Sequence, residues 1–198
     1  MNWAPLADSV AAWSRQVDVS IAVSLQSGPR WLHQATHLVP AASTAKIPIM
    51  VETFRRIERK ETALEALCTV CDPHAAKGSG VLRFLHDGLE LTVRDLLYLM
   101  IAISDNVATN MLIDAAGYDA INKTMHDLGM RDSVLGRPMV RRLAQPLEQE
   151  NLATAQDYLA LLEAIVEGRA ASASSCGAML ELLMGQQNNR RIGRVVFR

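Results

Sequence analysis

The sequence predicts an α+β fold, in which a large helical part follows a short N-terminal β-hairpin. Between Val19 and Leu25, apolar residues alternate with small or polar ones, which is typical of a strand with one heavily buried face. A Ser-Gly-Pro turn follows, and Arg30–Ala35 is expected as the returning strand. From residue 43 onward, apolar residues recur mainly at helical spacing. With 198 residues, of which 49% are hydrophobic and 21% charged, the chain has the composition of one globular domain.

One helix is expected before this hairpin and one after it. The first is an amphipathic helix over residues 3–15, and the second begins near Ser43 and ends near Lys60. The apolar stripe of the second helix consists of Ile47, Met50, Val51, Phe54 and Ile57. Pro48 fits this helix only in its first turn, where the missing N–H costs little. A hairpin alone is marginally stable, so either helices cover it or further strands are missing.

The rest of the chain is expected to be mostly helical. Residues 61–71 are interpreted as a short helix and an extended piece, and Val81–Leu85 as one helical turn. Thr92 opens a capping box, Thr-Val-Arg-Asp, and the helix that it starts runs to Ile103. Further helices are expected at about 107–116, 119–128, 153–167 and 174–187. Residues 130–151 show no sustained period, which makes this segment a candidate functional loop.

Charge and composition exclude several classes of function. With a net charge of −1 and an aromatic content of 5%, the sequence has neither a basic patch nor a stacking platform, so we expect no nucleic acid and no membrane partner. The N-terminus lacks the features of a signal peptide. The longest apolar run, Leu96–Ile103, is far below the ~20 residues of a membrane span. As written, the chain is expected in the cytoplasm, or to be exported if a leader is missing from the sequence.

Cysteine and histidine usage predicts no metal site. The chain has three cysteines, and an odd number argues against a disulfide framework. Cys68 and Cys71 have the spacing of a redox motif, but they lack the strand-then-helix context of a thioredoxin-like site. The five histidines show no metal-ligand signature.

The first stretch that carries chemistry is Pro40–Met50, where a helix begins. Ser43 lies at the start of this helix and Lys46 three residues later, so their side chains face the same space. Backbone N–H groups are unpaired at this end and the helix dipole is positive. A serine there can act as a nucleophile, and a lysine one turn away can take its proton when the lysine pKa is lowered. The alternative is a serine N-cap followed by an incidental lysine, because the motif is short.

The second candidate is Ser104-Asp105-Asn106, at the junction of two expected helices. Alone, this tripeptide also fits an ordinary helix N-cap. Ser-x-x-Lys followed by Ser-Asp-Asn is, however, the motif order of class A β-lactamases and penicillin-binding proteins. The sequence resembles this family along most of its length, at Ala41–Pro48, Gly78–Arg83, Leu91–Asn110 and Glu150–Asp157. The chain is therefore identified as similar to the class A β-lactamase-like serine hydrolases.

This resemblance implies an α/β sandwich of the β-lactamase/transpeptidase type and a set of catalytic residues. Ser43 would attack the carbonyl of a β-lactam or a D-alanyl peptide and form an acyl-enzyme. Lys46 would help to remove the Ser43 proton, and Ser104 would relay a proton to the leaving nitrogen. Asn106 would hold the substrate amide. The backbone N–H of Ser43 would supply half of an oxyanion hole, and no metal or other cofactor is implied.

The candidate loop departs from the family pattern. Hydrolytic members carry a loop glutamate that activates the deacylating water. The aligned position falls on Pro138 or Met139, and neither side chain can act as a base. Glu148 and Glu150 follow at the far end of the loop, either as surface carboxylates or as a replacement base. Without a base, the acyl-enzyme is expected to be long-lived.

The third family motif, K-[ST]-G, is also absent. The only Lys-Thr pair, Lys123-Thr124, lies within an expected helix. We therefore expect residues 1–198 to be a single β-lactamase-like domain that lacks the C-terminal strands and this motif, as in a truncated gene or a fragment. The hairpin would then be the remnant of an antiparallel sheet. Loss of one oxyanion donor can cost ~10²–10³ in rate, and an open strand edge invites self-association.

Three functional hypotheses follow. The leading one is a serine hydrolase that acts on β-lactam-type amide bonds through an acyl-enzyme on Ser43, weak or inactive in this chain. A second is a non-catalytic remnant or binding module that pairs its open strand edge with another chain. A third is a penicillin-binding D-alanyl-D-alanine peptidase, which the missing leader disfavours because its substrate lies outside the cell membrane.

Overall fold

The computed structural model describes residues 3–25, 28–71, 74, 76–139 and 150–188. The helices are α1 (Ala4–Trp13), α2 (Lys46–Glu58), α3 (Val93–Ala102), α4 (Asn106–Ala116), α5 (Tyr118–Asp127), α6 (Ala155–Val166) and α7 (Ala173–Met184). The strands are β1 (Ile21–Ser24), β2 (Arg30–His33), β3 (Val39–Pro40), β4 (Leu67–Thr69), β5 (Glu90–Thr92) and β6 (Leu152–Ala153), and short 3₁₀ turns form η1 (Ala42–Ala45) and η3 (Leu82–Phe84). Within the described residues, no helix has the length and apolar character to cross a membrane.

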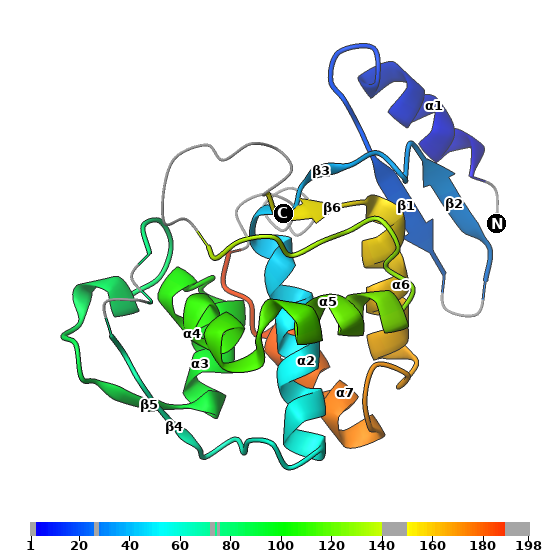
Figure 1. The fold of residues 1–198 in the computed structure, drawn as a ribbon. Helices are drawn as coiled ribbons and strands as arrows, with labels where there is room; N and C mark the ends of the chain where they lie inside the picture. The colour runs from blue at the N-terminus through cyan, green and yellow to red at the C-terminus, as the bar shows by residue number, and fades with distance from the viewer. Residues whose placement is uncertain (1–2, 26–27, 72–73, 75, 140–149, 189–198) are drawn as a thin grey trace.

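Helix α2 forms the centre of the core. It contacts α3, α4, α5 and α7, and it lies between these helices in Figure 1. Met50, Val51 and Phe54 of the predicted stripe are buried, whereas Ile47 and Ile57 are only partly buried. Ile49, which lies outside the predicted stripe, is also fully buried, because helices contact α2 on several sides. Burial of each such side chain stabilises the fold by about 1.5–3 kcal/mol. Pro48 lies in the first turn of α2, where its missing N–H is tolerated.

Side-chain caps define where the helices around α2 begin. The Thr92 side chain accepts a hydrogen bond from the Asp95 N–H, and the Asp95 carboxylate accepts one from the Thr92 N–H, which confirms the predicted capping box. The Asp105 side chain caps α4 by accepting hydrogen bonds from the N–H groups of Val107 and Ala108. Gly117, with a φ of +82°, separates α4 from α5, a conformation that favours glycine. The helices in the second half of the chain thus follow the sequence prediction closely.

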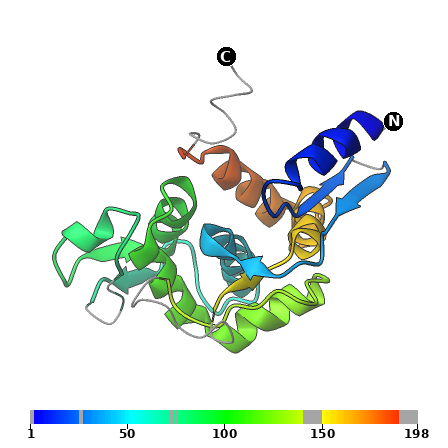
Figure 2. The same ribbon diagram turned by 90° about the horizontal axis from the view of Figure 1, so that it is seen from above.

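The predicted hairpin is present, but it is less buried than expected. β1 and β2 pair antiparallel, with Ile21 opposite His33 and Ser24 opposite Arg30. Figures 1 and 2 show this hairpin and α1 together at one edge of the molecule, with α6 next to the hairpin. Every residue of β1 is half-buried, so the expected heavily buried face is wrong. The reason is that β1 packs chiefly against β2 and α6.

The structure also corrects the strand content. Residues 61–66 form turns and not a helix, and they lead into β4, which pairs antiparallel with β5. A further pair joins β3 to β6, with Val39 opposite Ala153. Strands of two or three residues carry no readable alternation, so the prediction of a single hairpin missed both pairs. The β3–β6 pair places the segment before Ser43 beside the exit of the candidate loop.

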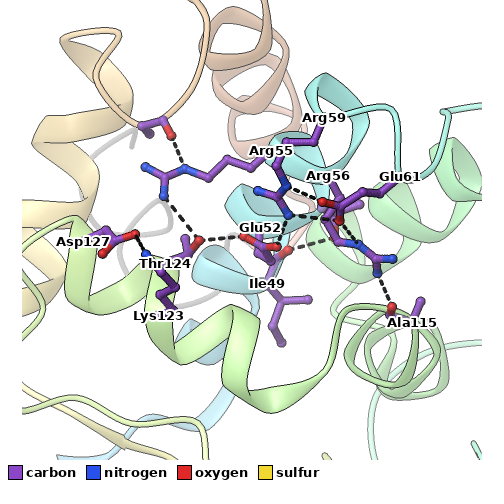
Figure 3. A network of polar contacts seen from close by, with 12 residues as sticks. Ile49, Glu52, Arg55, Arg56, Arg59, Glu61, Ala115, Lys123, Thr124 and Asp127 are labelled. Carbon is purple, nitrogen blue, oxygen red and sulfur yellow. Dashed lines mark hydrogen bonds and ion pairs between the residues drawn. The ribbon is translucent and has the colours of Figure 1, made fainter.

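A buried polar network fixes α2 against α5 (Figure 3). The Glu52 side chain is buried, with the residue 1% exposed, and it accepts hydrogen bonds from Thr124 Oγ1 at 2.6 Å and Arg59 Nη2 at 2.7 Å. Arg55 donates to Thr124 Oγ1 at 3.3 Å and to the carbonyl of Ala170 at 2.7 Å, so the network also reaches the segment between α6 and α7. A buried carboxylate is tolerated only with such partners. The network sets the rotation of α2 and therefore the direction of the side chains in its first turn.

Candidate active site

The nucleophile candidate lies in a short turn before α2. Ser43 is part of η1, and Lys46 is the first residue of α2. Ala42 has a φ of +46°, which is strained for a residue with a Cβ. The turn is anchored on both sides of this strain, because the Ala41 N–H donates to the carbonyl of Asn151 at 2.7 Å and the Thr44 hydroxyl donates to the carbonyl of Ala41 at 2.6 Å.

Lys46 is enclosed by three acceptors. The residue is 2% exposed, and its Nζ donates to the carbonyl and the Oγ of Ser104, both at 2.7 Å, and to Asn106 Oδ1 at 2.8 Å. Burial lowers the Lys46 pKa from 10.5 to about 8, although the carboxylate of Asp105 opposes this shift. With this pKa, a fraction of the Lys46 amine is neutral near pH 7 and can accept a proton.

Ser104 connects the lysine to the candidate nucleophile. Its hydroxyl lies 2.9 Å from Ser43 Oγ and 2.7 Å from Lys46 Nζ. Ser104 has a φ of +61°, so its backbone turns sharply at the junction between α3 and α4. A neutral amine has two N–H groups and one lone pair. The two N–H groups match the Ser104 carbonyl and Asn106 Oδ1, and the lone pair then faces the Ser104 hydroxyl. This geometry permits a proton to pass from Ser43 to the amine through Ser104.

Asp105, the middle residue of the tripeptide, has a structural role. One carboxylate oxygen accepts the N–H groups of Val81 and Leu82 at 2.6 and 2.9 Å. The other caps α4 by accepting the N–H groups of Val107 and Ala108 at 2.9 and 3.1 Å. Asp105 therefore ties the segment before η3 to the start of α4 and holds the residues on either side of it in place. The N-cap interpretation is thus confirmed for Asp105, while Ser104 and Asn106 on either side of it contact Lys46.

Asn106 faces the lysine on one side and the preceding loop on the other. Its Oδ1 accepts from Lys46, and its Nδ2 donates to the carbonyl of Lys77 at 2.8 Å. An amide nitrogen has two hydrogens, so one remains for a substrate carbonyl. A Cβ on Gly78 would lie 2.8 Å from Asn106 Nδ2, which explains the glycine at this close approach.

Met139 is one of the two loop residues, with Pro138, that align with the family's loop glutamate. The Asn110 side chain holds the backbone of this residue at two points. Asn110 Oδ1 accepts the Met139 N–H at 2.7 Å, and Asn110 Nδ2 donates to the Met139 carbonyl at 3.2 Å. The Met139 side chain is buried and lines a pocket together with Ala42, the neighbour of Ser43. A thioether therefore lines the pocket beside the turn that carries Ser43.

Glu150 is not a free surface carboxylate. It forms a two-point ion pair with Arg137, in which Nε and Nη2 contact one carboxylate oxygen each, the second at 3.0 Å. The guanidinium lowers the Glu150 pKa, and a carboxylate held in its charged form is a weak base. The ion pair joins two positions of the candidate loop that are 13 residues apart, and Asn151 Oδ1 accepts the N–H groups of Gly136 and Arg137. Glu148 lies outside the described residues.

The structure brings the four sequence-predicted residues, Ser43, Lys46, Ser104 and Asn106, into one cluster. Sequence reasoning did not single out Asn110, which holds the loop. Asn110 follows Asn106 by four residues, so both amides lie on one face of α4. This spacing could have predicted from the sequence that Asn110 faces the site. The Lys123-Thr124 pair lies within α5, as expected. In the described part of the chain, no group of three or more His, Cys, Asp or Glu side chains could hold a metal ion.

The site thus consists of a serine joined through a second hydroxyl to a buried lysine, with the Ser-x-x-Lys spacing, at the start of a core helix in an α+β fold. Residues 5–196 match the model of the beta-lactamase enzyme family, and the chain belongs to this family.

Known proteins agree with this assignment. The crystal structure of a β-lactamase from Sphaerobacter thermophilus is 48% identical with a TM-score of 0.93, over 99% of this chain and 74% of that one. A variant of PBP-A, solved as an acyl-enzyme complex with penicillin G, is 26% identical with a TM-score of 0.84, over 94% of this chain and 70% of that one. Beta-lactamase L2 of Stenotrophomonas maltophilia is 33% identical over 91 residues, a match that spans 46% of this chain and 30% of that protein.

Proposed function

We propose that this protein reacts with β-lactams through an acyl-enzyme on Ser43. The observation that carries the proposal is the contact chain from Lys46 Nζ to Ser104 Oγ at 2.7 Å and on to Ser43 Oγ at 2.9 Å. It supplies what a serine nucleophile requires, a neighbouring base within hydrogen-bond reach.

The proton route follows from this chain of contacts. Ser43 Oγ attacks the lactam carbonyl carbon while its proton passes to Ser104, and the Ser104 proton passes to the neutral Lys46 amine. When the ring C–N bond breaks, Ser104 gives a proton to the leaving nitrogen and is reprotonated by Lys46. The free N–H of Asn106 Nδ2 orients the substrate amide. The backbone N–H of Ser43, in the first turn of η1, stabilises the developing oxyanion.

Hydrolysis of the acyl-enzyme is expected to be slow. Met139 cannot activate water, and Glu150 is engaged by Arg137. The Sphaerobacter relative is described as a β-lactamase, and the PBP-A variant as a penicillin acyl-enzyme. Both relatives support acylation of this chain. Because its loop offers no base for deacylation, we expect the chain to hold penicillin as a long-lived acyl-enzyme.

Acylation is tested with a fluorescent penicillin and intact-protein mass spectrometry. The wild type is expected to gain one acyl group. Ser43→Ala is expected to gain none, whereas Ser9→Ala, a serine on α1 that bonds only within its helix, should react like the wild type. Lys46→Met should slow labelling by about 10²-fold or more, since a general base contributes ~10²–10⁴. Lys123→Met, at an exposed ion pair, serves as its control. A folded wild type that stays unlabelled refutes the proposal.

Deacylation is tested separately with Met139→Glu. A carboxylate at this position should shorten the lifetime of the penicilloyl adduct without changing its site. The half-life of the adduct, followed by mass, is the readout. An unchanged half-life would mean that the Met139 position is not where deacylation is controlled. A D-alanyl thioester in the same assay examines the D-alanyl peptidase alternative, which uses the same acylation steps.

A second candidate function is strand pairing with another chain. In the described residues β1 pairs with β2 alone, so its other edge has no strand partner there. Such an edge is a template for a strand from a second copy. Size-exclusion chromatography with light scattering at several concentrations tests this candidate. A monomer at all concentrations contradicts it.

A further inference from the structure

A second group of reactive side chains begins two residues after β4. Cys71 Sγ is 3.1 Å from His74 Nδ1, and His74 Nε2 is 3.6 Å from Asp114 Oδ2 on α4. A thiol, an imidazole and a carboxylate thus follow one another within contact distance. This is the arrangement of a nucleophile, its base and the group that orients the base.

The orientation of the imidazole suits proton transfer from the thiol. The Asp114 carboxylate faces Nε2, so it favours the form in which Nε2 carries the hydrogen and Nδ1 accepts from the thiol. The His74 side chain is 14% exposed, whereas that of Asp114 is 80% exposed. The carbonyl of His74 also accepts a hydrogen bond from Asn110 Nδ2 at 3.3 Å, which anchors the residue to α4. The base is therefore held in place while the thiol remains partly accessible.

The other two cysteines lack this environment. Cys176 is buried, and its sulfur contacts the carbonyl of Ala171 at 3.6 Å. Cys68 lies in β4, and burial raises its thiol pKa, which lowers the fraction of thiolate. All three cysteines are free thiols. Of the three, Cys71 has a histidine as its hydrogen-bond partner.

We propose that Cys71 is a nucleophilic thiol activated by His74, and that it forms mixed disulfides with low-molecular-weight disulfides of the oxidised glutathione class. His74 Nδ1 takes the thiol proton, and the resulting thiolate attacks one sulfur of the disulfide. A bond forms between Cys71 Sγ and that sulfur, the original S–S bond breaks, and the second half leaves as a thiolate. Asp114 stabilises the imidazolium formed on His74. This chemistry does not depend on acylation of Ser43.

The test is the rate at which the folded protein takes up glutathione from oxidised glutathione, followed by intact mass and by mapping of the modified peptide. The wild type and Cys68→Ser should each gain one reductant-reversible adduct on Cys71, and Cys71→Ser should gain none at comparable rate. His74→Gln removes the base that lies 3.1 Å from the thiol and should slow uptake by about tenfold, because the thiol proton then has no imidazole to accept it. His86→Gln is the matched control, since this histidine contacts the carbonyl of Asp87 and no thiol.

Asp114→Asn provides a second variant, because its exposed side chain can be changed without disturbing the core. It should slow uptake by about threefold through weaker support of the imidazolium. Alkylation by iodoacetamide should show the same order of rates. The proposal is wrong if His74→Gln and His86→Gln react equally fast, or if uptake persists in Cys71→Ser because Cys68 is the reactive thiol.

Discussion

The buried lysine makes stability depend on pH in a direction that can be calculated. Lys46 has a pKa of about 8 in the folded protein and an ordinary value of 10.5 once exposed by unfolding. Between these values the unfolded chain binds more protons than the folded one. Stability contributed by Lys46 therefore rises with pH across this window, and the buried charge costs stability below it. The perturbation that isolates this effect is Lys46→Met.

The magnitude follows from the pKa shift. A shift of this size corresponds to about 3 kcal/mol in full. The unfolding free energy of the wild type, relative to that of Lys46→Met, should increase by about 2.5 kcal/mol between about pH 7 and pH 10. The variant also leaves Ser104 and Asn106 without their donor, but that cost does not change with pH in this range. Other titrating groups are common to both proteins, so they cancel in the difference.

The assay is urea unfolding of both proteins at about one-unit pH intervals, analysed by linear extrapolation. The difference in unfolding free energy should change most steeply between about pH 8 and pH 10, by about 1.4 kcal/mol per pH unit at most. A difference that stays flat would refute the lowered lysine pKa, and with it the proposed base. The rate of Ser43 labelling should rise over the pH range in which Lys46 loses its proton.

Two further substitutions, each with a matched control substitution, test the packing around the site by thermal unfolding. Thr124→Val removes a hydrogen bond to the buried Glu52 carboxylate and should cost about 2 kcal/mol. Thr53→Val, equally buried but bonded to a helix carbonyl, should cost clearly less, and equal losses would contradict the role given to the network. Gly80→Ala should cost ~3 kcal/mol or more, because φ is +112° and a Cβ would lie 2.3 Å from the carboxylate that caps α4. Gly88→Ala, with φ of +86° and open space, should cost about 1 kcal/mol, and similar values for both glycines would refute the clash.

The sequence was most informative where the signals are local. The capping box at Thr92, the apolar stripe of α2 and the glycine at the end of α4 each depend on residues within a few positions of one another. These signals place the helices nearly as the structure has them. The Ser-x-x-Lys spacing predicted that both side chains face the same space, because three residues make nearly one turn. The helix itself begins later than predicted, since Ser43 lies in η1 and α2 begins at Lys46.

Contacts between distant segments could not be predicted in the same way. The β4–β5 pair joins strands of three residues that are about twenty positions apart, too short to show alternation. Asp105 was interpreted as a cap, and its second pair of contacts, to Val81 and Leu82, depends on how an unrelated loop returns to α4. The same holds for Cys71, whose partner His74 is close in sequence but whose third member, Asp114, comes from α4.

The central claim is that Ser43 is the acyl-forming nucleophile, and intact-protein mass spectrometry with benzylpenicillin tests it most directly. The folded wild type should gain the mass of one penicilloyl group, and peptide mapping should place it on Ser43. Ser43→Ala should remain unmodified under the same conditions. A folded wild type without the adduct, or an adduct that persists in Ser43→Ala, would contradict the account.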